Sequence, residues 1–320
     1  ISNINSFSDA PFKNLKRLYL NNNKLNSESL LDLNFSELNK LDLSQNSITD
    51  FSFLDKIKIN NLKLLNLSHN KIVEIEPIAN YDFTKLINLN LSNNNIKNIN
   101  CLVNAKFVGL KELNLNYNEI ENIDVLEKVD FKELYYLDLG VNKITNIDIL
   151  SNVNFPELNI LDLSVNKISD IDILEYVNFK KLKLLNFRIN KISDIDVLER
   201  VDFKELKGID FSKNKISDIN VLERVNFEHL NELYFRSNEI SDINVLERVN
   251  FKELKILYLS YNNISDIKVF GTGVSTAAVS DYDFISWPAS GNNLTNTFSV
   301  STPWSITLNP SGLILRLHPV

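Results

Sequence analysis

The chain of 320 residues has one cysteine, three histidines, no methionine and only seven glycines. A single thiol, Cys101, excludes an intrachain disulfide framework and a zinc cluster built on thiolates. No apolar run approaches the roughly 18–20 residues that cross a bilayer. A net charge of −7 argues against a nucleic-acid partner, because phosphate recognition needs a basic surface. The composition that remains, 44% hydrophobic and 23% charged, is typical of a globular protein with an ample core.

An internal repeat dominates the rest of the sequence. The pattern Leu-x-x-Leu-x-Leu-x-x-Asn-x-Ile recurs with a first step of 23 residues and later steps of 24. Its asparagines, which we call the ladder asparagines, are Asn23, Asn46, Asn70, Asn94, Asn118, Asn142, Asn166, Asn190, Asn214, Asn238 and Asn262. Eleven copies in register identify a solenoid of stacked units.

Each position of the unit has a physical role. The alternating Leu-x-Leu predicts a short strand with one buried face, and stacked asparagines are expected to satisfy backbone groups of adjacent turns. Apolar residues 2, 5, 8 and 11 positions after the asparagine predict a short helix or 3-10 turn. A phenylalanine near the end of most units, such as Phe131 and Phe155, predicts a line of rings inside the array.

These residues resemble the leucine-rich repeat family, in particular the class found in internalins and in a regulatory subunit of protein phosphatase 1. The resemblance implies an α/β fold, a right-handed solenoid with a curved parallel sheet on its concave side and short helices or 3-10 turns on its convex side. Units of that class typically have 22 residues, so the 24-residue unit and its phenylalanine depart from the class.

The repeat array is expected to cover residues 1–270 and to begin in the middle of a unit, as in an excerpt of a longer protein. Residues 271–320 contain neither lysine nor glutamate and differ in kind from the repeats. The turn sequence from Asn309 to Gly312, between two apolar runs, predicts a β-hairpin. This segment is interpreted as a β-rich cap or a partial domain, with an unrelated segment as the alternative.

No constellation for catalysis, cofactor binding or metal binding is evident in the sequence. The repeats contain no glycine-rich phosphate loop and no local Ser–His signature. His69 is interpreted as a solvent-facing residue and Cys101 as a packing residue. A row of acids (Asp170, Asp194, Asp218, Asp242 and Asp266) is assigned to turn capping in preference to calcium binding, because no unit has the spacing of a calcium loop.

The concave face carries the candidate binding site. Strand alternation points Tyr136, Ile160 and Leu184 outward, and the turn before each ladder asparagine is expected to expose Tyr117, Val141, Val165 and Ile189. Asp138, Asp162 and Asn186 run between these two rows. Exposed apolar groups around polar ones are typical of an interaction surface, although scattered surface hydrophobes are the plain alternative. We call these ten residues the central patch.

A second anchor set is predicted toward the C-terminal end of the array. It consists of Arg188, Tyr234, Arg236, Tyr258 and Tyr261, and tyrosine and arginine dominate the energetics of protein interfaces. Over the same region the outer half of the unit is nearly invariant while the inner positions vary. A uniform scaffold with a varied inner face favours a role in ligand recognition over random sequence drift at surface positions.

These features predict a non-enzymatic module that binds a protein or peptide through its concave face, of the kind found in surface adhesins and receptor-like proteins. The alternative is a structural protein that self-associates into a fibre or surface layer through the solenoid ends and residues 271–320. A third interpretation, an enzyme fragment, has no support in the sequence. No cofactor, metal or membrane span is predicted. A secreted or surface location is favoured by the internalin-like pattern, although the single cysteine also suits the cytosol.

Overall fold

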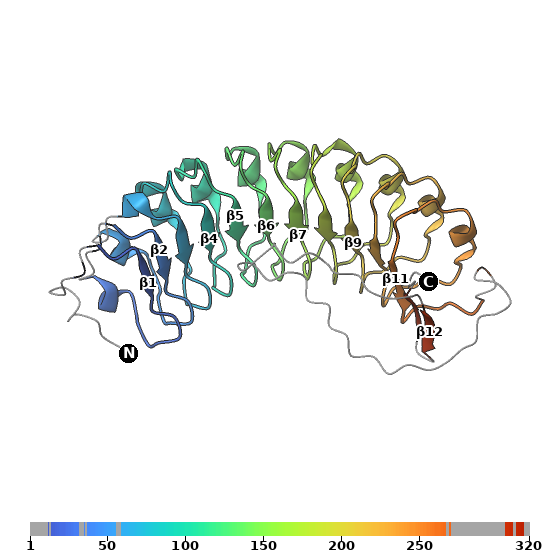
Figure 1. Ribbon diagram of the computed structural model, residues 1–320, viewed down its shortest axis with the longest axis horizontal. Coiled ribbons are helices and arrows are strands. Elements are labelled where there is room, and N and C mark those ends of the chain that lie inside the picture. Colours follow the sequence, from blue (N-terminus) through green and yellow to red (C-terminus); the bar gives the residue numbers. More distant parts are fainter. Residues whose placement is uncertain are drawn as a thin grey trace.

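The structure is a computed structural model of the chain. It describes Phe12, residues 14–31, Phe35, residues 37–55, residues 59–266, Val269, residues 305–309 and residues 312–316. For Ile59 and for residues 305–316 it describes the backbone only. In Figure 1 the repeats follow an arch, with the 3-10 turns along its outer rim.

Eleven consecutive parallel strands, one per repeat, form the sheet that the sequence predicts. They are β1 (Arg17–Tyr19), β2 (Lys40–Asp42), β3 (Leu64–Asn66), β4 (Asn88–Asn90), β5 (Glu112–Asn114), β6 (Tyr136–Asp138), β7 (Ile160–Asp162), β8 (Leu184–Asn186), β9 (Gly208–Asp210), β10 (Glu232–Tyr234) and β11 (Ile256–Ser260). Each strand pairs in register with the equivalent residues of the next, for example Leu137 with Leu161. The right-handed solenoid with a curved parallel sheet is therefore confirmed.

The outer half of each unit forms 3-10 turns. The turns are η2 (Glu28–Leu30), η3 (Ser52–Asp55), η4 (Ile59–Asn61), η5 (Glu76–Asn80), η6 (Asn100–Asn104), η7 (Asp124–Glu127), η8 (Asp148–Ser151), η9 (Asp172–Tyr176), η10 (Asp196–Glu199), η11 (Asn220–Glu223) and η12 (Asn244–Glu247). The predicted spacing of about three residues thus corresponds to 3-10 geometry. No helix among the described residues is long and apolar enough to cross a membrane.

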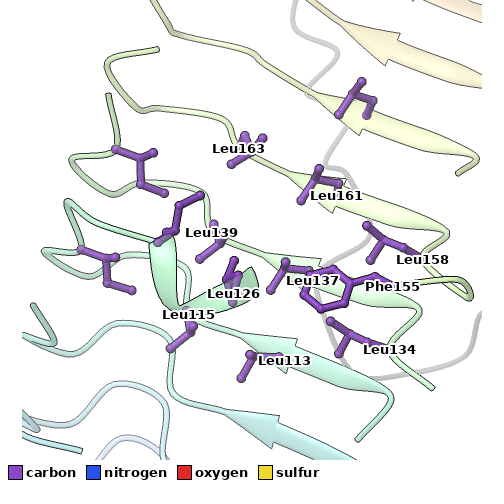
Figure 2. Packing of buried hydrophobic residues seen from close by; sticks show 14 of the residues in the cluster. Leu113, Leu115, Leu126, Leu134, Leu137, Leu139, Phe155, Leu158, Leu161 and Leu163 are labelled. Atoms are coloured by element: carbon purple, nitrogen blue, oxygen red, sulfur yellow. The ribbon is translucent and has the colours of Figure 1, made fainter. Parts of the chain in front are cut away.

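The core lies between the sheet and these turns. Figure 2 shows leucines of neighbouring strands, such as Leu137 and Leu161, in parallel rows, with Leu126 of η7 packed against them. All three of these leucines are buried. A strand of three residues cannot bury one face alone, so the stability of each unit depends on its neighbours.

The ladder asparagines bind the backbone of two adjacent repeats, as predicted. The Nδ2 of Asn142 donates to the carbonyl oxygens of Leu139 in its own repeat and Leu115 in the preceding one, each at 3.0 Å. Its Oδ1 accepts the N–H of Ile120 at 3.0 Å. The same pattern continues to Asn262. Each buried asparagine therefore joins two units through groups that would be costly to leave unpaired.

Aromatic rings stack along the array in two lines. The predicted line includes Phe83, Phe107, Phe131 and Phe155, whose successive ring centroids lie 5.7, 6.1 and 6.1 Å apart. A second line, which we did not predict, joins Phe187, Phe211 and Phe235 at 5.8 Å per step. Its signal is in the sequence, because phenylalanine replaces the third leucine of the unit in these three repeats.

The aspartates of the outer row cap the 3-10 turns. Asp194 Oδ1 accepts the N–H of Asp196 at 2.8 Å, and Asp218 and Asp242 make the equivalent bond two residues on. This is the capping role that the sequence favours over calcium. Cys101 is buried and its Sγ lies 3.3 Å from the carbonyl oxygen of Ile75, as expected of a packing residue. Burial raises the pKa of this thiol to about 12.

The predicted hairpin is present in the backbone. Strands β12 (Ser305–Asn309) and β13 (Gly312–Arg316) pair antiparallel, with Asn309 opposite Gly312. Strand β13 also pairs antiparallel with β11 and so extends the sheet beyond the repeats. The remainder of residues 271–320 lies outside the described residues, and the division of the chain at residue 270 stays a prediction.

Candidate concave binding site

The sheet register brings the central patch together. Tyr136, Ile160 and Leu184 are direct partners across β6, β7 and β8, and so are Asp138, Asp162 and Asn186. The turn residues Val141, Val165 and Ile189 follow in the same three repeats, with Tyr117 one repeat earlier. The patch is therefore a continuous surface and not a scatter of residues.

The expectation that the strand residues of the patch are exposed is wrong for Tyr136 and Ile160, whereas Leu184 is half-buried. Tyr136 is 7% exposed and Ile160 6%, while Tyr117 on the turn is 58% exposed. Adjacent strands lie about 4.8 Å apart, so large side chains on one curved face cover one another. The Tyr136 hydroxyl also donates to Asp138 Oδ2 at 3.0 Å. The strand residues thus form a packed floor, buried at Tyr136 and Ile160. The rim above it is exposed at Tyr117 and half-buried at the three β-branched turn residues.

The rim has an unfavourable backbone conformation for its residue types. Every residue before a ladder asparagine, from the repeat of β1 to that of β11, has a positive φ between 50° and 58°. Asparagine tolerates this left-handed region and stands there as Asn22 and Asn93, but Val141, Val165 and Ile189 are β-branched. Three successive repeats therefore hold an apolar side chain where the backbone disfavours it, at a cost of order 1 kcal/mol or more each.

The polar row of the patch holds the turns in place. Asp138 Oδ1 accepts the N–H of Gly140 at 2.9 Å and the Nδ2 of Asn116 at 3.1 Å. One repeat later, Asp162 Oδ1 accepts the N–H of Ser164 at 2.8 Å. Asn66, Asn90 and Asn114 make the same bond two residues on in the preceding repeats. An amide is therefore sufficient for this local role, and the two carboxylates add a charge that the turn does not need.

Gly140 allows polar groups to converge at the centre of the patch. A Cβ at this position would lie 2.7 Å from Asn116 Nδ2 and 3.0 Å from both Asp162 Oδ1 and Ser164 Oγ. Most other repeats have serine here, so the glycine permits an unusually close approach of these side chains. Sequence analysis missed Gly140, although its replacement of that serine was a visible signal.

The two carboxylates are poorly solvated and repel each other. Burial, followed by the charge of Asp162, raises the pKa of Asp138 to about 6. Burial also raises the pKa of Asp162, against hydrogen bonds from Ser164 and Asn186. Asn186 Nδ2 donates to Asp162 Oδ2 at 2.8 Å. Like charges on adjacent strands are unfavourable, so this arrangement does not serve the stability of the sheet.

The second anchor set is also assembled, but in two parts. The rings of Tyr234 and Tyr258 stack with centroids 5.0 Å apart, and both are buried, so they are preformed walls and not protruding anchors. The guanidinium of Arg236 lies 4.7 Å from the ring centroid of Tyr261, which is exposed. Arg188 lies two residues after the end of β8, as Arg236 lies two residues after the end of β10, two strands away.

Other candidate chemistry is sparse in the described part of the chain. No group of three or more histidine, cysteine, aspartate or glutamate side chains there is arranged to hold a metal ion. His69 is exposed on a turn, as predicted.

Comparisons with known proteins agree with this fold. Family models described as "Leucine rich repeat" and "Leucine Rich repeats (2 copies)" match residues 60–120 and 108–152. The comparison with curated proteins gives no significant match.

Among solved structures, an internalin of Listeria monocytogenes is similar, with 31% identity, 81% of this chain and 78% of that chain covered, and a TM-score of 0.63. Internalin C2 of the same species is 28% identical over 59% of this chain and 77% of its own, with a TM-score of 0.50. The Arabidopsis receptor kinase HAESA, solved with the peptide hormone IDA and the co-receptor SERK1, is 23% identical. That match covers 77% of this chain and 43% of HAESA, with a TM-score of 0.54.

Proposed function

Because this chain belongs to the leucine-rich repeat family and has internalins among its relatives, we propose that it is a non-enzymatic module that binds a protein or peptide across its concave face. The binding surface is centred on the repeats of β6, β7 and β8. The site residues are those of the central patch, with the second anchor set extending the surface toward β11. A role as a surface adhesin or receptor-like protein belongs to the same proposal.

One observation carries the proposal. Val141, Val165 and Ile189 hold left-handed backbone that asparagine adopts at equivalent positions, and they do so in three adjacent repeats. Strained residues that the fold does not require are expected where the side chain serves a function. The three side chains rim the packed floor of Tyr136, Ile160 and Leu184, which supplies the apolar area typical of an interface core.

The two carboxylates of the central patch support the same assignment. Asp138 and Asp162 carry charges that the turn geometry does not need, in the two repeats that begin this apolar region. Apolar groups around a few fixed polar groups give both affinity and register to a bound segment. The peptide complex of HAESA is an example of a fold of this kind binding a peptide.

The proposal is tested with peptides selected from a random display library on the wild-type chain. The variant Ile160→Asp with Val165→Lys places charges on the floor and the rim. We expect it to lower the affinity for the selected peptides by tenfold or more, and tenfold corresponds to about 1.4 kcal/mol of binding free energy. Isothermal titration calorimetry on the isolated peptides gives the affinities.

A matched control uses the equivalent positions four strands away. Leu64→Asp with His69→Lys makes the same changes in the repeat of β3, and we expect it to leave binding within about twofold. Circular dichroism checks that both variants fold. Equal affinity for the wild type and the Ile160→Asp/Val165→Lys variant would contradict the proposed site.

A further inference from the structure

Arg236 and Ser260 lie side by side near the C-terminal end of the concave face. Strands β10 and β11 pair with Tyr234 opposite Tyr258, and the N–H of Ser237 donates to the carbonyl oxygen of Ser260 at 2.8 Å. Arg236 and Ser260 each stand two residues after these tyrosines, at the same position of successive units. Their side chains therefore emerge on the same face of the sheet, one strand apart.

Both side chains contain a buried donor without a partner. Ser260 is 1% exposed, and neither its Oγ nor the Nε of Arg236 makes a hydrogen bond within the described part of the chain. A buried unpaired donor costs about 1–3 kcal/mol, so two adjacent ones in a well-packed repeat call for a physical explanation.

The repeat explains why these donors are unpaired. In the repeat of β2, Ser44 Oγ donates to Asp42 Oδ1, two residues earlier, at 2.6 Å. At the corresponding positions before Arg236 and Ser260 the acid is replaced by Tyr234 and Tyr258. The tyrosines remove the internal acceptor from both positions, in two successive units.

The surroundings hold these donors in position. The guanidinium of Arg236 is stacked over Tyr261, and the rings of Tyr234 and Tyr258 stack beside it on the same face. The ion pairs of arginine in the described part of the chain involve Arg200, Arg224 and Arg248, and none involves Arg236. Asp210, the acid on neighbouring β9, accepts the N–H of Ser212 at 2.7 Å. On the other side of Ser260 the register places Gly312, which has no side chain.

We propose that Arg236 and Ser260 form a carboxylate-binding subsite. Arginine has donors only, and a serine hydroxyl with no internal acceptor is free to donate, so the missing group is an acceptor. A planar carboxylate matches the edge of the guanidinium that contains Nε, and one of its oxygens is then in reach of Ser260 Oγ. This inference rests on the proposed function for the source of the carboxylate, an aspartate or glutamate side chain of the bound partner.

The subsite is tested without the partner. Sodium acetate is titrated into the ¹⁵N-labelled full chain at constant ionic strength set with chloride, and the Nε–H resonance of Arg236 is followed by NMR. We expect a saturable shift of this resonance. Ser260→Ala should lower the affinity for acetate by fivefold to tenfold. Arg236→Lys keeps the charge but removes the paired N–H donors of the guanidinium. It should abolish the saturable shift of the backbone amide resonance of Ser260.

Ser44→Ala is the matched control for Ser260→Ala, because Ser44 stands at the same position of the unit and keeps its internal acceptor, Asp42. It should leave acetate binding at Arg236 unchanged. No shift of the Arg236 resonance, or equal acetate affinity in the wild type and Ser260→Ala, would overturn the subsite. A response to inorganic phosphate with none to acetate would overturn the assignment to a carboxylate.

The library-selected peptides test whether the carboxylate comes from the bound partner. We expect them to contain an acidic residue whose change to the amide weakens binding as much as Ser260→Ala does. Peptide binding that is independent of any acidic residue would overturn the assigned source. Insensitivity to Ile160→Asp with Val165→Lys would instead refute the proposed function, and the acetate titration would still report on the subsite by itself.

Discussion

The repeats of β3–β5 and those of β6–β8 have the same backbone and different concave faces. In both groups a side chain two residues before the turn accepts the same backbone N–H, as Asn90 does for Ser92 and Asp162 for Ser164. Both groups turn through a residue with positive φ, such as Asn93 or Val165. In the repeats of β3 and β4 the turn residues are His69 and Asn93, types that tolerate this conformation, whereas in β6–β8 all three turn residues are β-branched. The difference separates what the fold requires from what it merely tolerates.

The two groups share the asparagine ladder. Loss of a ladder asparagine should have the largest effect on the free energy of unfolding. Asn94→Ala and Asn142→Ala each remove an amide that is bonded to two repeats. We expect each to lower the free energy of unfolding by about 3 kcal/mol or more, because buried backbone groups lose their partners. Urea denaturation measures both. Losses that differ by more than about 1 kcal/mol would show that the scaffold is not equivalent in the two groups.

The acid pair should make the stability of β6–β8 sensitive to pH. The pKa of Asp138 is raised from 3.8 to about 6, so the folded protein binds this proton more tightly than the unfolded chain does. The stabilisation is complete below about pH 4 and is lost as the pH rises through about 6. Asp138→Asn keeps an acceptor for the N–H of Gly140 and removes the charge.

Relative to the wild type, Asp138→Asn should therefore gain about 2–3 kcal/mol between pH 4 and pH 7.5, at 1.36 kcal/mol per pKa unit. Urea denaturation at a series of pH values gives this difference directly. Asp42→Asn is the matched control, because its partner on β3 is Asn66 and not an acid. A flat difference curve for Asp138→Asn would contradict the raised pKa that burial and the charge of Asp162 give to Asp138.

The strained rim should give the smallest effect per residue. Val141→Asn, Val165→Asn and Ile189→Asn replace β-branched residues by the type that tolerates positive φ, so each should stabilise the fold by about 1 kcal/mol. The reverse change, Asn93→Val, should destabilise the repeat of β4 by a similar amount. Thermal unfolding by calorimetry compares the four variants. Destabilisation by all three asparagine substitutions would mean that the apolar rim serves packing.

Much of the fold follows from the sequence because each unit repeats the same pattern of apolar and asparagine positions. Spacing alone predicted the ladder, the line that contains Phe131, and a short helix or 3-10 turn in each unit. The C-terminal hairpin was predicted from the turn sequence between two apolar runs. The burial of Tyr136 and Ile160 was not, since strand alternation gives the direction of a side chain but not the cover that its neighbours provide.

The candidate site was predictable in position but not in character. Sequence comparison located the unusual rows, and only the backbone angles reveal that Val141, Val165 and Ile189 are strained. The unpaired donors of Arg236 and Ser260 likewise emerge only from a full account of hydrogen bonds, although the tyrosines that replace the usual acid were visible in the sequence.

The central claim is that residues 141, 165 and 189 are retained for binding in spite of the backbone. The most direct measurement is the affinity of a selected peptide for the triple variant Val141→Asn/Val165→Asn/Ile189→Asn beside that for the wild type. We predict a loss of tenfold or more in a protein that is more stable than the wild type. Unchanged affinity in that more stable variant would contradict the claim.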